Sequence, residues 1–116
     1  MVDEKLGTVR ISPQVLATIA RLTIESVPGV VHLYHDFSRD VDRLFKGKGG
    51  SGGVSVQVVD GAVLVDLAIV AQKDINLYAL GREIQGQVSR AIKEMVGMPV
   101  LAVNVHIENV QVSKEE

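Results

Sequence analysis

The fold of this chain is decided by residues 54–70, which read VSVQVVDGAVLVDLAIV. Two runs rich in β-branched residues flank Asp60-Gly61, and an Asp-Gly pair in that position favours a tight hairpin with a type I′ turn. A two-residue loop brings apolar side chains together on one face, for example Val56 opposite Val65. Because the turn and the hydrophobic pattern require the same register, we predict an antiparallel hairpin here.

An amphipathic helix is predicted on each side of this hairpin. The first begins at Ser12-Pro13, where serine can cap the free N–H groups and proline suits the first turn. The second begins at Asp74 and stops at Gly97. The predicted buried stripes are Val15, Leu16, Ile19, Leu22 and Thr23 in the first helix and Leu77, Gly81, Ile84, Val88, Ala91, Ile92 and Met95 in the second.

Three further segments are compatible with strands. Residues 6–11 read as a short strand, and residues 30–34 as a second short strand or an extended connector. Residues 100–112 alternate most regularly, which is typical of a strand with one buried face. In that strand Leu101, Val103, Val105 and Ile107 are predicted to point inward, and Asn104, His106 and Glu108 outward. A short helix is also compatible with residues 36–46.

These elements give the order β-α-(β)-β-β-α-β in a single domain over residues 1–116. Each helix has one apolar stripe and each regular strand one apolar face. The economical arrangement is an α+β fold, a two-layer sandwich with both helices on one face of a mainly antiparallel sheet.

Composition narrows the function classes. The chain of 116 residues has a formal net charge of −2, is 47% hydrophobic and contains no cysteine. The slightly acidic balance provides no general attraction for nucleic acid or anionic lipid. Without cysteine there are no disulfides, thiolate metal sites or cysteine nucleophiles. No apolar run approaches the roughly 18–20 residues that span a bilayer, so we expect a cytoplasmic protein without direct membrane insertion.

The glycine-rich segment 47–53, GKGGSGG, is predicted to be a flexible loop. It contains a formal G-x-G-x-x-G pattern, but a dinucleotide site needs that pattern to open a helix, and here a strand follows. The G-x-x-G of KH domains likewise lies between two helices. We therefore predict no cofactor, and nucleic-acid binding is disfavoured.

Metal and catalytic sites are also disfavoured. If the segment containing His32 and His35 is extended, the two imidazoles lie on opposite faces and do not share an ion. Ser55, His106 and Asp66 could be combined into a nucleophilic triad, but no segment supplies an oxyanion hole or a pocket. The sequence therefore predicts no metal site, no catalytic residues and no enzymatic activity.

The outward face of the sheet is the best candidate for function. Its polar side chains are interleaved with apolar ones, which suits contact with a protein partner or a second copy of the chain. An ordinary solvated face is the alternative. The candidate protein-binding face comprises Ser55, Gln57, Leu64, Asp66, Ala68, Asn104, His106 and Glu108.

An ordered set of motifs covers nearly the whole chain and gives a family resemblance. The chain resembles the alkaline shock protein family (Asp/Gls type) of envelope stress response proteins. The motifs are GTVRIS at 7–12, VPGV at 27–30, GVSVQV at 53–58, VLVDLAI at 63–69, EMVGMPV at 94–100 and VNVHI at 103–107.

The resemblance implies a non-enzymatic scaffold or adaptor in bacterial cell-envelope and general stress homeostasis, acting by self-association and protein binding. Family members are cytoplasmic, and some lie at the inner face of the membrane through a membrane-anchored protein partner. The apolar residues on the outer face of the sheet lead us to expect a homo-oligomer. The resemblance supplies no catalytic residue. The alternative is a regulator that binds a metabolic enzyme or, less favoured, RNA, whose sheet-type binding domains usually display stacking aromatics.

Overall fold

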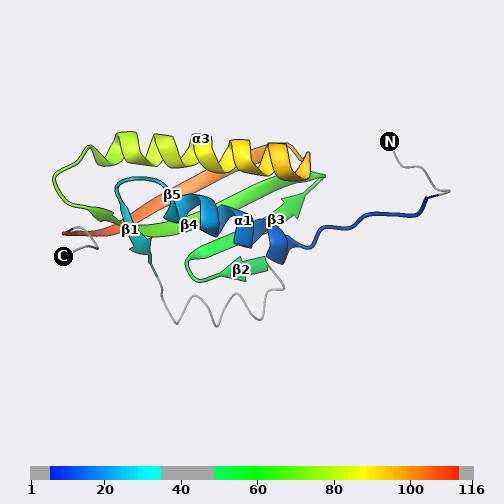
Figure 1. Cartoon of the computed structure of the whole chain (residues 1–116), viewed down its shortest axis with the longest axis horizontal. Coiled ribbons are helices and arrows are strands. Elements are labelled where there is room, and N and C mark those ends of the chain that lie inside the picture. The colour runs from blue at the N-terminus through cyan, green and yellow to red at the C-terminus, as the bar shows by residue number, and fades with distance from the viewer. Residues whose placement is uncertain (1–5, 35–48, 113–116) are drawn as a thin grey trace.

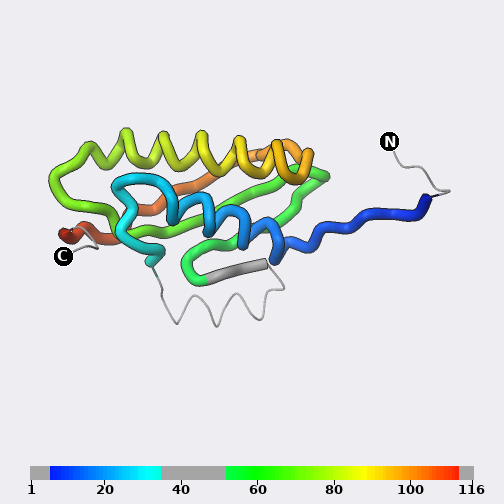
Figure 2. The backbone as a smooth tube through the Cα atoms, in the orientation of Figure 1, coloured from blue at the N-terminus to red at the C-terminus, as the bar shows by residue number. Residues whose placement is uncertain are grey.

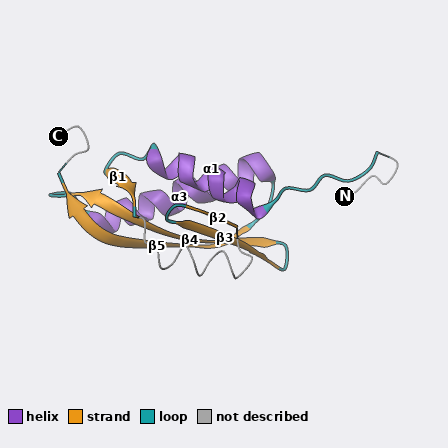
Figure 3. Cartoon of the chain, turned by 90° about the horizontal axis from the view of Figure 1, so that it is seen from below, coloured by secondary structure: helices purple, strands orange, loops and turns teal. Residues whose placement is uncertain are grey.

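The structure, a computed structural model, describes residues 6–34 and 49–112 (Figure 1). In this part of the chain, two helices lie on one face of a five-stranded sheet (Figure 3). This confirms the α+β class and the two-layer arrangement. The elements are α1 (Pro13–Glu25), β1 (Val30–Leu33), β2 (Gly49–Ser51), β3 (Val54–Val59), β4 (Ala62–Gln72), α3 (Leu77–Val96) and β5 (Val100–Gln111).

β4 is the central strand, and both of its edges are paired. β3 and then β1 lie antiparallel along one edge, and β5 lies parallel along the other. Along the first edge of β4, the pairing partner changes from β3 to β1 at Ala68. The Ala68 N–H donates to the Gly53 carbonyl and its carbonyl accepts from the Tyr34 N–H, both at 2.9 Å. β4 therefore pairs directly with every described strand of the sheet except β2.

The predicted hairpin is confirmed, with its register. Val56 pairs with Val65 across β3 and β4. The turn residues Asp60 and Gly61 have φ values of 51° and 79°, and positive φ at both positions is what a type I′ turn requires. The inward side chains of the two strands are buried in the core beneath the helices, except Val58 near the turn, which is 42% exposed.

Both helices form where the sequence predicts them, but their N-caps differ in detail. Ser12 occupies the N-cap of α1 without a side-chain capping bond. In the second helix the cap is Asn76 rather than Asp74, because the Asn76 side chain accepts from the N–H of Ala79 at 2.9 Å. Asp74 adopts a φ of 66° in the preceding turn, outside helical geometry.

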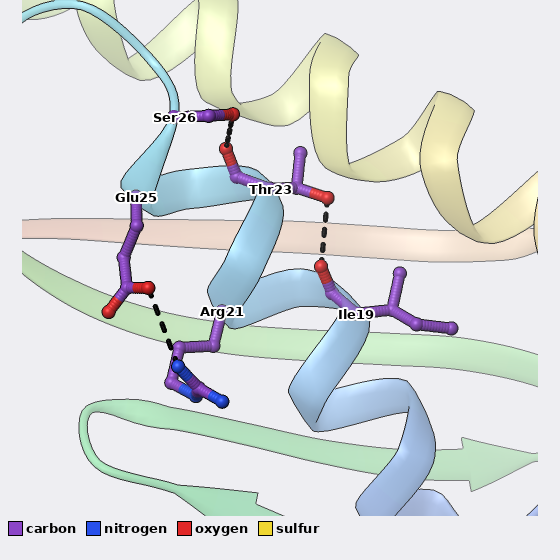
Figure 4. Close-up of polar contacts among 5 residues, drawn as sticks. All are labelled: Ile19, Arg21, Thr23, Glu25 and Ser26. Atoms are coloured by element: carbon purple, nitrogen blue, oxygen red, sulfur yellow. Dashed lines mark hydrogen bonds and ion pairs between the residues drawn. The ribbon is translucent and has the colours of Figure 1, made fainter.

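The last turn of α1 is closed by short-range polar contacts (Figure 4). The Thr23 hydroxyl donates to the Ile19 carbonyl at 2.8 Å, and the Ser26 hydroxyl donates to the Thr23 carbonyl at 2.7 Å. Arg21 and Glu25, one turn apart, form an ion pair of 3.4 Å on the exposed side. The Ser26 contact satisfies a backbone carbonyl at the end of the helix, where intrahelical partners run out.

The buried stripes of the helices are rotated from those predicted. In α1, Val15 and Leu22 are exposed, because the helix packs against both α3 and the β2–β3 side of the sheet. Alanines on those sides permit close approach. The core-facing residues are Leu16, Ala17, Ala20 and Ile24 in α1 and Leu80, Ile84, Val88 and Ile92 in α3. Met95, predicted to be buried, is exposed.

The prediction of a strand over residues 6–11 is wrong. No strand forms there, and the segment extends away from the body of the molecule (Figures 1 and 2). Val9 is 91% exposed. Local β propensity is present, but a strand needs a neighbour to satisfy its backbone groups, and the described residues place none beside it.

The glycine-rich segment also differs from the loop predicted over 47–53. Gly49–Ser51 is a short strand, β2, antiparallel to β3, with Gly50 opposite Ser55. Backbone pairing with β3 gives this segment a strand structure that its composition alone did not indicate. Residues 47–48 and the helix predicted over 36–46 lie outside the described residues.

β5 follows the predicted alternation only between two irregularities. Its register against β4 shifts at Leu101 and again at Glu108, so neither of these residues has a paired residue in β4. An extra residue of this kind changes the facing of its neighbours. Leu101, predicted to point inward, is consequently 61% exposed, whereas Val103 is buried.

The junction around Ala68 generates a stability prediction. A Cβ on Gly53 would lie 2.5 Å from the Tyr34 carbonyl oxygen, and the residue has a φ of 88°. We expect Gly53→Ala to destabilise the protein by about 3 kcal/mol, because backbone strain and a clash with fixed backbone combine.

Gly61→Ala is the matched control. Gly61 has a similar φ of 79°, but an added Cβ meets nothing within 4 Å. Strain alone predicts a loss of about 1 kcal/mol. Urea unfolding of both variants measures the difference, and equal losses would show that the junction is not tightly packed.

Candidate functional site

The outer face of the sheet, turned away from the helices, carries the residues predicted to bind protein. The register of three strands brings them into rows. Ser55 of β3 lies opposite Asp66 of β4, which lies opposite Asn104 of β5. The next row places Gln57 opposite Leu64. The predicted residues of β3 and β4 are therefore brought together as expected.

A side-chain hydrogen bond joins β4 to β5 on this face. Asn104 Nδ2 donates to Asp66 Oδ1 at 3.0 Å. An amide opposite a carboxylate across parallel strands ties two side chains in one orientation, and this leaves less of the Asp66 carboxylate available to a ligand.

Burial divides the candidate face into two parts. Ser55 and Ala68 are only 8% and 4% exposed, so a partner has little access to them. Gln57, Leu64 and Asp66 are half-buried, and Asn104, His106 and Glu108 are exposed. The accessible part of the face therefore lies along β5 and extends over the neighbouring half of β4.

Glu108 stands apart from the rows. The register shift after Ile69 pairs Val70 with Asn109, so Glu108 has no opposite residue in β4. Sequence alternation alone put Glu108 in line with Asn104 and His106, and it could not foresee the extra residue.

Ser55, His106 and Asp66 are not arranged as a hydrogen-bonded triad. His106 lies opposite Ala68 rather than Asp66, and the Asp66 carboxylate contacts Asn104 instead. Among the described residues, no group of histidine and acidic side chains is arranged to hold a metal ion. His32 Nδ1 lies 2.9 Å from the Leu33 carbonyl oxygen, and His35 falls outside the described part of the chain.

The strands of the described segments contain no phenylalanine, tyrosine or tryptophan. Sheets that bind single-stranded RNA usually stack bases on aromatic side chains. Of the residue types that stack on bases, the described strands offer only histidine, at His32 and His106.

A groove between α3 and β5 was not predicted from the sequence. It has a volume of about 260 Å³ and opens along the side of β5 that no described strand covers. An added Cβ on Gly81, which lines the groove, would meet no atom within 4 Å. The lining residues are Leu77, Tyr78, Gly81, Arg82, Gln85, Val105 and Ile107.

Polar contacts organise the helix side of this groove. The Arg82 guanidinium donates to the Tyr78 hydroxyl from Nη2 at 2.6 Å and from Nε at 3.1 Å, and its carbon lies 5.1 Å from the ring centroid. Gln85 Oε1 accepts from Arg82 at 3.1 Å, while Gln85 Nε2 donates to the Val103 carbonyl at 3.0 Å. Tyr78, Arg82 and Gln85 recur at helical spacing, a signal available in the sequence, although none of the three belongs to the predicted buried stripe.

The Gln85 contact also identifies which backbone groups lie on the free edge of β5. The N–H groups of Val63 and Lys73 donate to the Pro99 and Gln111 carbonyls at the two ends of β5. The N–H and C=O groups of the odd-numbered residues of β4 therefore point toward β5. In parallel pairing, the β5 residues opposite them point their own N–H and C=O groups away from β4. The carbonyl of Val103 therefore lies on the outer edge, where Gln85 reaches it, and the backbone groups of Val105 and Ile107 lie on the same edge.

Comparison with known proteins gives a consistent family assignment. The model of the alkaline shock protein 23 family, described as having a cell envelope-related function, matches residues 1–112. Uncharacterized protein Spy1535 of Streptococcus pyogenes is 31% identical over 114 residues, which cover 98% of this chain and 87% of that protein. Uncharacterized protein YqhY of Bacillus subtilis is 25% identical over 109 residues, which cover 94% and 81%. No solved structure matches the chain.

The cross-strand pair on the outer face yields a salt-dependent prediction. We expect Asn104→Asp to lower the free energy of unfolding at low salt by about 1 kcal/mol, because it places two carboxylates opposite each other. Salt screens the repulsion between them, so the deficit should shrink at about 1 M salt. Asn104→Ala removes the hydrogen bond without the repulsion and serves as the control. Urea unfolding at both salt concentrations measures the effect, and a salt-independent deficit for Asn104→Asp would contradict the pairing.

Proposed function

This chain belongs to the alkaline shock protein 23 family, of cell envelope-related function, and from that premise we propose that it acts as a non-enzymatic scaffold or adaptor in bacterial envelope and general stress homeostasis. It works by self-association and by binding other proteins. The proposal requires a surface that recognises protein, and it requires no reaction chemistry.

The accessible outer face along β5 is the observation that supports this function. Asn104 and His106 are exposed there, and the half-buried Leu64 lies one row from Asn104, opposite Ala102. Neither described helix covers this side of the sheet (Figure 3). Hydrogen-bonding groups next to apolar surface are the usual make-up of a non-obligate protein interface.

In this proposal the protein works in the cytoplasm and reaches the inner face of the membrane through a membrane-anchored protein. Of the helices in the described segments, neither is long and apolar enough to span a bilayer. The chain carries a net charge of −2 and no cysteine for lipidation. Attachment through a protein partner is consistent with that chemistry.

Affinity capture from a native lysate with membranes retained tests the adaptor role. Wild-type protein and the His106→Glu variant are compared, with Ala79→Glu as a control that adds the same charge on the exposed side of α3. The proposal expects a membrane protein to be retained by the wild type and by Ala79→Glu and to be lost with His106→Glu. Identical capture by all three proteins would remove the outer face from the proposal.

Self-association through this face can be measured separately. Ala68 is too buried for a surface test, since a charge there would destabilise the monomer itself, so the substitution is made at exposed His106. We expect His106→Glu to change monomer stability by no more than about 0.5 kcal/mol and to weaken association, because an unpaired buried charge is costly. Sedimentation equilibrium across a concentration series measures this. A wild-type chain that stays monomeric at high micromolar concentration would leave only a monomeric adaptor.

Membrane association should depend on the partner. We expect the purified protein not to co-sediment with anionic liposomes at physiological salt, because a net charge of −2 gives no electrostatic attraction. Liposomes carrying the captured membrane protein should restore sedimentation. Strong sedimentation with bare liposomes would contradict indirect attachment.

A further inference from the structure

Two of the backbone segments that lack a strand neighbour in the described chain complement each other. One is the free edge of β5, on the side away from β4. The other is the arm, residues 6–11, which reads LGTVRI and precedes α1. An unpaired edge with regular backbone groups is a template for another strand, and an unpaired β-prone segment is a suitable strand to add.

The arm has a sequence typical of a strand, but it is exposed and pairs with no described strand of its own chain. Thr8, Val9, Arg10 and Ile11 alternate polar and apolar residues, three of the four being β-branched. Leu6 and Val9 are 87% and 91% exposed. The arm runs outward from the start of α1, away from α3 and the body of its own chain (Figures 1 and 2).

The receiving edge presents both hydrogen-bonding groups and apolar surface. The backbone groups of Val105 and Ile107 lie on the free edge, and their side chains line the groove under α3. The groove is open above Gly81, where a side chain is missing. A strand added to this edge would place every second side chain in the groove.

We propose that the arm of one copy adds to the β5 edge of a second copy, with Val9 and Ile11 in the groove beneath α3 and Thr8 and Arg10 on the outer face. This deepens the proposed self-association and rests on it. Arg10 would then lie on the side of the sheet that carries the Asp66 carboxylate. Arg82, the one charged side chain among the described residues that line the groove, would face apolar side chains.

A second copy fits this edge through its arm better than through its own β5. Pairing of β5 with β5 about a twofold axis would bring two grooves together, each with Arg82 and with no carboxylate among the lining residues. An arm carries no charge on its groove-facing side. Because the donor and acceptor surfaces differ, each copy can both give and receive an arm. Such a contact is heterologous and builds an open chain of molecules.

Two matched pairs of full-length variants test the proposal by sedimentation equilibrium. Val9→Lys brings a charge into the groove beside Arg82, whereas Thr8→Lys places the same charge on the opposite face of the arm. Gly81→Leu fills the groove, whereas Gly86→Leu makes the same change at an open position of α3 that does not line it. Helix propensity rises equally in both glycine variants, and thermal unfolding checks that all four fold.

The expected result is asymmetric within each pair. Val9→Lys and Gly81→Leu should each raise the dissociation constant at least about 30-fold, since an unpaired charge or a filled groove blocks the contact. Thr8→Lys and Gly86→Leu should associate like the wild type. An equimolar mixture of Val9→Lys and Gly81→Leu should form a 1:1 dimer that grows no further, because one chain retains the groove and the other retains the arm.

Other outcomes separate this proposal from the proposed function. If the wild type associates and all four variants associate equally, arm exchange is wrong while self-association stands; loss with His106→Glu would then assign it to the outer face. A mixture that stays monomeric also overturns arm exchange. If the wild type is monomeric at high micromolar concentration, both arm exchange and self-association are wrong, and the adaptor role is judged by affinity capture alone.

Discussion

The rest of the structure depends on the need of β4 to satisfy its backbone on both edges while it is buried. Its inward side chains form the centre of the core, and Ala68 and Val70 are buried as well. A buried strand cannot leave N–H and C=O groups to water. The chain therefore places β3 and β1 in succession along one edge and β5 along the other.

This constraint fixes where the structure remains open. Once β4 is enclosed, the sheet ends at β1 and β2 on one side and at β5 on the other. α3 protects the β5 edge only in part, through the bond from Gln85 to the Val103 carbonyl. Edge strands that stay unprotected favour association. The outer face and the β5 edge, the two surfaces proposed for self-association, thus arise from the same enclosure of one strand.

Features fixed by neighbouring residues were predictable. Asp60-Gly61 determined the hairpin, because that dipeptide adopts positive φ at low cost. The extent of the two helices followed from their amphipathic periods. The same local logic failed for residues 6–11, where β propensity was present without a partner, and for Gly49–Ser51, where a partner gave strand structure to a glycine-rich segment.

By itself the sequence determined the hairpin, the helices, the α+β class and the resemblance to a family, since each depends on residues close together in the chain or on ordered motifs. Tertiary structure alone decided the parallel pairing of β4 with β5, the register shifts at Leu101 and Glu108, and the groove that Gly81 leaves open. It also decided that Ser55 and Ala68 are buried while His106 is exposed. These outcomes depend on contacts between distant segments, whose packing no local pattern specifies.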